Sequence, residues 1–140
     1  MEVSLALLAD AANTTATQKL NVLGVFGNIN PPGLPYRHPS MTLVLKFDAD
    51  PVEVGTEKSI HIVLVDPDGR EINRLEMTTT IPEPREPGQP IEMALQVGLN
   101  GLRFERSGPH AFVVIVNGET KRRVPLTVTP RPQEPAPPGD

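Results

Sequence analysis

The distribution of proline constrains this chain more than any other feature of its sequence. The 140 residues include 17 prolines, of which thirteen fall in three segments: Asn30–Pro39, Ile81–Pro90 and the last twelve residues. Proline lacks a backbone donor and breaks helices, so it collects where hydrogen-bonded ladders stop. We therefore expect ordered structure in the blocks between the proline clusters.

Those blocks alternate between apolar and polar residues, which is the pattern of half-buried strands. The clearest example is Ile91–Leu99, where every odd-numbered residue is apolar and points to one side. Eight strands are predicted in this way: Val3–Leu8, Lys19–Ile29, Met41–Phe47, Ser59–Val65, Arg70–Thr78, Ile91–Leu99, His110–Val116 and Arg123–Val128.

The same pattern predicts where some strands lie in their sheets. Ser59–Val65 and His110–Val116 are apolar on both faces, which favours central positions, whereas Arg70–Thr78 is more polar and favours an outer position. Pro125 is tolerable only where its strand forms an edge. Gly24 indicates a β-bulge or a strand buried on both sides. Residues 10–15 are expected to form a polar connection or one short helical turn.

Many short strands joined by turns, with little or no helix, predict an all-β fold. Asp66–Gly69 and Asn117–Gly118 have the composition of tight turns. We expect an antiparallel two-sheet β-sandwich of the immunoglobulin-like kind, with an open barrel as the alternative. Residues 1–128 are predicted to form a single domain, and residues 129–140 a Pro-rich disordered tail.

Composition excludes several classes of function. The chain has no Cys, which excludes disulfides, thiol catalysis and thiolate metal sites. Its net charge of −4 argues against a nucleic-acid partner, and no apolar run approaches the length of a membrane-spanning helix. The segment Met1–Asp10 lacks the basic start and the long apolar stretch of a secretory signal, so we expect a cytoplasmic protein.

Two aspartate pairs are the best candidates for a metal site. Asp48 and Asp50 follow one predicted strand, and Asp66 and Asp68 follow the next one along the chain. Oxygen-rich loops at one end of a sandwich can bind Ca²⁺, which prefers six to eight oxygen ligands. The spacing resembles that of calcium-dependent phospholipid-binding sandwich domains. The alternative is that these aspartates only stabilise turns by accepting backbone hydrogen bonds.

Catalytic patterns are missing from the sequence. The histidines, His38, His61 and His110, do not have the spacing of a zinc site, and His61 is expected to be mostly buried. None of the four serines lies in a nucleophile motif, and Ser107 near His110 reads as a turn before a strand. We expect no enzymatic activity and no cofactor.

A surface for a protein partner is predicted at two places. Tyr36, with Arg37 and His38, lies in the first Pro-rich segment and is the aromatic residue best placed for presentation on a loop. Arg122 and Arg123 belong to the one basic cluster of the chain. Each place has a simpler interpretation, as a stiff connector or as a solvated strand that discourages edge pairing.

Three segments, taken in order, resemble a family of small bacterial proteins of unknown function. They are Leu5–Ala12, Lys19–Phe26 and Leu99–Phe104, and the resemblance extends from about Met1 to Val128. It implies a bacterial, single-domain, intracellular protein and brings no catalytic residue, ligand or partner with it.

From these observations we expect a non-catalytic protein-interaction or assembly module. The alternative is a sandwich that binds a divalent cation or a small ligand through its Asp-rich loops. The sequence does not identify a partner or predict an oligomeric state.

Overall fold

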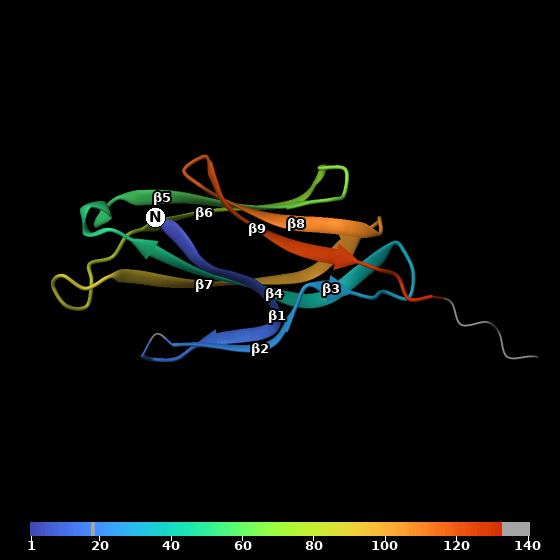
Figure 1. Cartoon of the computed structure of the whole chain (residues 1–140), viewed down its shortest axis with the longest axis horizontal. Coiled ribbons are helices and arrows are strands. Elements are labelled where there is room, and N and C mark those ends of the chain that lie inside the picture. Colours follow the sequence, from blue (N-terminus) through green and yellow to red (C-terminus); the bar gives the residue numbers. More distant parts are fainter. Residues whose placement is uncertain (18, 133–140) are drawn as a thin grey trace, which may run out of the picture.

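The computed structural model describes residues 1–17 and 19–132, and it confirms the predicted all-β fold. In the described residues it has nine strands and one short 3-10 turn, η1 (Figure 1). Their bounds are β1 (Glu2–Thr14), β2 (Leu20–Phe26), β3 (Asn28–Ile29), β4 (Tyr36–Ala49), η1 (Pro51–Glu53), β5 (Glu57–Val65), β6 (Glu71–Thr80), β7 (Ile91–Phe104), β8 (Gly108–Val116) and β9 (Glu119–Val128).

The strands form two sheets that pack face to face. Sheet A has the order β2-β1-β4-β7, and sheet B has the order β3-β9-β8-β5-β6. Within the described residues, the strand pairs are antiparallel except for the short pair of β3 with β9. The inward-facing side chains of both sheets build one apolar core, whose largest fully buried members include Phe47, Phe104 and Phe112.

The predicted positions of several strands within their sheets are confirmed, and burial of apolar surface explains these positions. β5 and β8, which are apolar on both faces, lie inside sheet B, and the more polar β6 lies at its edge. Pro125 of β9 faces Ala111 of β8, while β3 pairs with β9 only at Thr127 and Val128. Pro125 therefore sits at an edge, where its missing donor interrupts no ladder.

The expected connection at residues 10–15 is wrong, because β1 continues as a strand to Thr14. The second half of β1 leaves β4 and pairs only with β2, forming a hairpin that lies against the outer face of sheet A (Figure 1). The side-chain amide of Gln96 on β7 hydrogen-bonds to the Thr14 hydroxyl. Val44 points to the outer face of sheet A and is nevertheless fully buried, as expected under such a cover.

The bulge predicted at Gly24 is also wrong, and so is the alternative of a strand buried on both sides. The β1–β2 register is the same before and after this position, because Ala9 faces Val25 and Ala11 faces Leu23. Gly24 instead has a positive φ of +71° and lies against the Asp10 side chain. Val25 is 62% exposed, so this strand is open on one face.

The C-terminal segment pairs beyond the last strand. The backbone N–H groups of Thr129 and Arg131 donate to the carbonyls of Ile29 and Pro31, both at 2.9 Å or less. The rest of the predicted disordered tail, residues 133–140, lies outside the described residues. In the part of the chain that the structure describes, no helix is long and apolar enough to cross a membrane.

A cluster of charges holds η1 against the start of β1. Glu53 accepts hydrogen bonds from the Met1 ammonium at 2.6 Å and from the backbone N–H of Asp50 at 2.7 Å, and Lys58 Nζ lies 3.0 Å away. These donors, the Met1 ammonium first among them, lower the pKa of Glu53 to about 2. The ionised carboxylate is therefore the form that stabilises this end of the sandwich.

We predict that Glu53→Gln makes stability less dependent on pH in acid. A carboxyl whose pKa is lowered by folding stabilises the protein above its unfolded pKa, and this contribution is lost as the pH falls toward about 2. Above pH 5 the variant should lose roughly 1–2 kcal/mol of unfolding free energy, with the difference vanishing near pH 2. Urea titrations between pH 2 and 7 measure it, with the exposed Glu57→Gln as control. A constant difference at every pH would contradict this assignment.

We predict that Gly24→Ala destabilises the β1–β2 hairpin. Alanine disfavours a φ of +71°, and its Cβ would overlap the Asp10 carboxylate. The free energy of unfolding should fall by roughly 1–3 kcal/mol. Gly27→Ala is the matched control, because Gly27 is close in sequence and an added Cβ there meets no atom within 4 Å. Equal losses in the two variants, measured by urea unfolding, would refute the role given to Gly24.

Candidate interaction surface

One long side of the sandwich is closed by contacts between the sheets. Lys121 Nζ on β9 lies 2.9 Å from Glu2 Oε1 on β1, and Arg122 donates to the Val3 carbonyl at 2.9 Å. The hydrogen bond to Glu2 raises the pKa of Lys121. The first strand of sheet A is thereby tied to β9 of sheet B.

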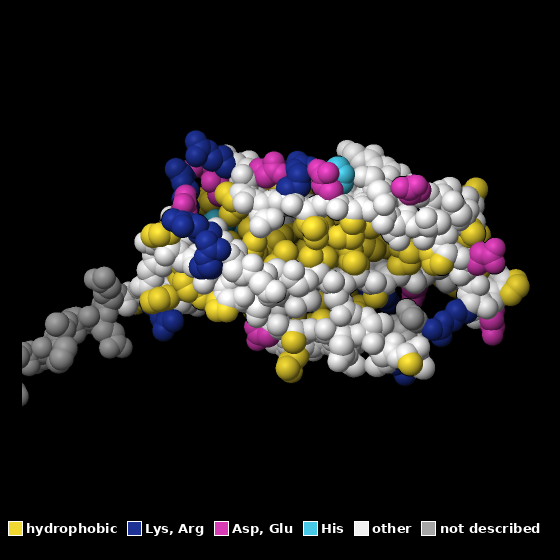
Figure 2. All heavy atoms as spheres, turned by 180° about the vertical axis from the view of Figure 1, so that it is seen from behind, with side chains coloured by type: hydrophobic (Ala, Val, Ile, Leu, Met, Phe, Trp, Pro, Cys, Tyr) yellow, Lys and Arg dark blue, Asp and Glu magenta, His cyan; other side chains and the backbone are white. Residues whose placement is uncertain are grey.

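The opposite long side is bounded by two edge strands, β6 of sheet B and β7 of sheet A. Between them lie half-buried apolar side chains that pack against the core from its margin. Figure 2 views this side and shows a continuous strip of hydrophobic atoms between the two sheets. We call this strip the apolar band; its members are Leu75, Met77, Met93, Leu95 and Leu99.

Charged side chains line the outer face of β6 above the apolar band. Arg74 forms an ion pair with Glu71, lies 3.4 Å from Glu76 Oε1 and lies 3.3 Å from His61 Nδ1. The ion pair with Glu71 is the main cause of the raised pKa of Arg74. His61 is half-exposed on this face, so its predicted burial is wrong. Its neighbours on β5 are buried because they occupy the inner face of the sheet.

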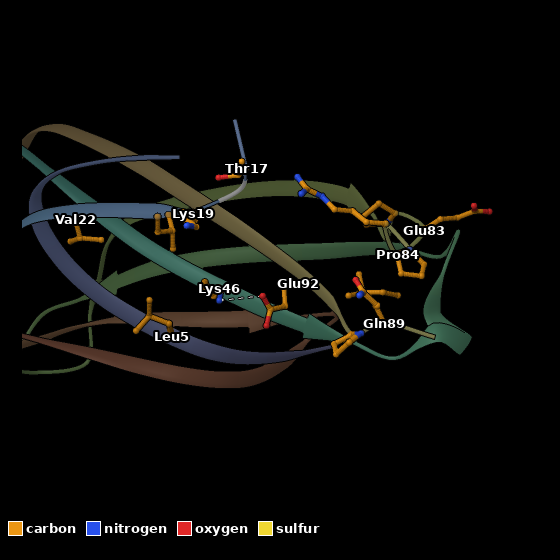
Figure 3. Close-up of a pocket in the computed structure, with 14 residues that line it drawn as sticks. Leu5, Thr17, Lys19, Val22, Lys46, Glu83, Pro84, Gln89 and Glu92 are labelled. Atoms are coloured by element: carbon orange, nitrogen blue, oxygen red, sulfur yellow. Dashed lines mark hydrogen bonds and ion pairs between the residues drawn. The ribbon is translucent and has the colours of Figure 1, made fainter. Parts of the chain in front are cut away.

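A cleft of about 980 Å³ lies on the outer face of sheet A, between that face, the β1–β2 hairpin and the Pro-rich segment 82–90. In Figure 3, Leu5 and Val22 lie at one end and Pro84 and Gln89 at the other. Lys46 and Glu92 form an ion pair at 3.4 Å on its floor. The lining is thus a mixture of apolar and charged groups.

The charges of this cleft do not converge on one point. Glu83 points outward, away from the pair formed by Lys46 and Glu92, while Lys19 lies on the hairpin (Figure 3). General acid–base or nucleophilic catalysis requires groups within hydrogen-bonding reach of one reacting atom. The labelled side chains are instead spread along the length of the cleft.

The two aspartate pairs lie at opposite ends of the sandwich. Asp48 and Asp50 precede β5 and stand next to η1, whereas Asp66 and Asp68 follow β5 (Figure 1). The nine residues of β5 span roughly 30 Å. The two pairs are therefore too far apart for all four carboxylates to bind one ion. No group of three or more potential ligands that could hold a metal ion occurs within residues 1–17 and 19–132.

Asp66 acts as a turn residue, the simpler of the two interpretations. Its Oδ1 accepts hydrogen bonds from the backbone N–H groups of Asp68 and Arg70, both at 2.9 Å, and the side chain is nearly buried. Asp68 is exposed and forms an ion pair with Arg106. The carboxylate of Asp66 is thus committed to the backbone of the β5–β6 turn.

The predicted loop position of Tyr36 is wrong, because β4 begins at this residue and pairs with the end of β7. Tyr36 and His38 face inward and are half-buried, with ring centroids 5.8 Å apart. His38 also lies 6.3 Å from the ring of Phe26. Arg37 is exposed and donates to the Gly101 carbonyl at 2.8 Å, so the segment builds one end of the sandwich.

The basic cluster is divided by the alternation of β9. Arg122 points toward β1, where its guanidinium satisfies the Val3 carbonyl, and is structural. Arg123 points the other way, to the exposed outer face of sheet B. His110, by contrast, is buried, packs edge-on to Phe104 and hydrogen-bonds with the Gly108 carbonyl at 3.0 Å. The cluster does not form one patch.

The apolar band is a surface that the alternation of apolar residues in the sequence does not predict. Met93, Leu95 and Leu99 were assigned to the inner face of a strand, which is where they lie. They are partly exposed because β7 is the edge strand of sheet A. The alternation within one strand does not predict which strand lies at the edge of a sheet. A usable signal was the polar outer strand, β6, which indicated one of the two edges.

We predict that Asp66→Ala destabilises the β5–β6 turn by roughly 1–3 kcal/mol, because two backbone donors lose their acceptor. Asp66→Asn keeps an acceptor oxygen and should retain most of the stability. Asp68→Ala, which removes only an exposed ion pair, should cost less than about 1 kcal/mol. Thermal and urea unfolding rank the three variants. A ranking with Asp68→Ala as the most damaging would contradict the turn assignment.

Comparison with known proteins gives a family and no activity. The model of a family of unknown function (DUF6941) matches residues 4–129, which confirms the resemblance found in the sequence. No curated protein and no solved structure matches the chain. Since the matched range spans most of its length, the chain belongs to the family of unknown function DUF6941.

Proposed function

We propose that this protein is a non-catalytic protein-interaction or assembly module of the immunoglobulin-like kind, acting in the cytoplasm of a bacterial cell. The observation that carries the proposal is the apolar band between the edge strands β6 and β7. Exposed edges flanking apolar surface are a known route to pairing with another chain.

The form of the two edges supports this function. β7 is 14 residues long and carries only two charged residues, Glu92 and Arg103. Proteins usually blunt exposed edges with charge, proline or short strand length. Neither β6 nor β7 contains a proline. Long edges without proline are suited to strand addition, and the neighbouring apolar side chains would add hydrophobic contact.

The alternative function, binding of a divalent cation or small ligand through the Asp-rich loops, has less support. The loops lie at opposite ends of the sandwich, and Asp66 is occupied by two backbone donors. The interaction function needs no such convergence, because it rests on side chains that already lie side by side.

We predict that the apolar band contacts another polypeptide in living cells. A photo-crosslinking amino acid at Met77 or Met93 should give a discrete adduct when the full chain is expressed in its native host. Val52 is the matched control, because it is an apolar residue that is 86% exposed on η1, away from the band. Mass spectrometry of the adducts identifies the contacting chain. Yields at Met77 and Met93 no higher than at Val52 would overturn the proposed function.

A further inference from the structure

We infer that a second copy of this chain binds the apolar band, with β6 of one copy pairing antiparallel to β6 of the other across a two-fold axis. The inference rests on the proposed function and names its partner. A two-fold interface must be self-complementary, because the same surface patch is contributed by both copies. Arg74 and Glu76 of β6 are self-complementary in one register, in which each of these charges lies opposite a charge of the other sign.

Side-chain alternation limits the possible registers. Leu75 and Met77 face inward because they pair with Ile62 and Ile60 of β5, whereas Arg74 and Glu76 face outward. Pairing must keep inward residues opposite inward residues, because a slip of one residue would turn the apolar side chains to the wrong face. One residue of β6 therefore lies directly opposite its own copy, and the two-fold axis passes midway between these two copies. We name each register by that residue and call it an axis through the residue.

An axis through Leu75 places Arg74 of each copy directly opposite Glu76 of the other. This register forms two opposite-charge cross-strand pairs and sets the two Leu75 side chains against each other on the inner face. Directly opposite charges of unlike sign stabilise a strand pair, and like charges destabilise it. Glu71, the remaining charge of the strand, lies beyond the register shift at Ile72 and therefore outside this regular stretch of pairing.

The two neighbouring registers are unfavourable for the same reason. An axis through Arg74 places the two arginines opposite each other, and an axis through Glu76 does the same with the two glutamates. Both put like charges in direct opposition. The free edge of β6 thus distinguishes one pairing from its closest competitors.

This pairing would also cover the apolar band. It extends sheet B continuously from one copy into the other, so the inward side chains of β6 in each copy lie beside those of the second copy. The edge strands β7, which border the band in sheet A, then face each other across the same axis. Apolar surface that is open in the single chain becomes buried, which favours association.

Charge reversal tests the register. Sedimentation equilibrium of the full chain should show a dimer, and R74E or E76R should each raise its dissociation constant by about tenfold or more, because each reversal creates two like-charge pairs. The double variant R74E/E76R restores opposite charges across the axis and should recover most of the affinity. Circular dichroism melts of each variant separate loss of pairing from loss of folding.

R123E is the matched control. Arg123 lies on the same outer face and in the same cross-strand row as Arg74, through Val63 and Val113, but at the other margin of the sheet. Its reversal should leave the dissociation constant unchanged. A double variant no tighter than the single variants would overturn the proposed register.

A parent chain that stays monomeric at every concentration would overturn the dimer itself. Failure of the dimer is distinguishable from failure of the proposed function. A monomeric chain that still gives adducts with a different protein from Met77 or Met93 overturns the second copy as partner and leaves the interaction function in place. Absence of any adduct at these positions, self-adducts included, overturns the function.

Discussion

The packing of two inner faces against each other is the interaction on which the rest of this structure depends. Each sheet presents a row of apolar side chains that only the other sheet can cover, and Phe47 and Phe112 are buried in this way. The loops, the hairpin over sheet A and the turn at Asp66 are arranged around that core. Burial of apolar surface is non-directional, so it holds the two sheets together without determining which contacts form along the two long sides of the sandwich.

The two long sides of the sandwich differ: one is closed by polar contacts between the sheets, and the other is open. The open side is the candidate interaction surface. On one side, Lys121 and Arg122 of β9 reach Glu2 and the Val3 carbonyl of β1, and these polar contacts close the gap between the sheets. On the other side, β6 and β7 end their sheets, and apolar side chains remain partly uncovered (Figure 2). A margin of that kind can be completed by another strand.

The outer face of sheet A shows a second way to cover apolar surface. Val44 is apolar and points away from the core, and the β1–β2 hairpin folds over it. In this hairpin Gly24 has a positive φ and lies against the Asp10 side chain, and the register of the ladder is the same on both sides of it. The cleft of Figure 3 is the space that remains between this hairpin and the Pro-rich segment.

The sequence by itself determined the fold class, the central strands and the edge position of β6, because alternation along one strand reports directly which of its faces is buried. It also identified Asp66–Gly69 as a turn. Only the tertiary structure decided that Tyr36 faces inward, that the two Asp pairs are far apart, and that Leu75 and Met93 share one open margin. These properties depend on which strands become neighbours. Strand order is set by the joint packing of segments distant in sequence, and no local pattern contains it.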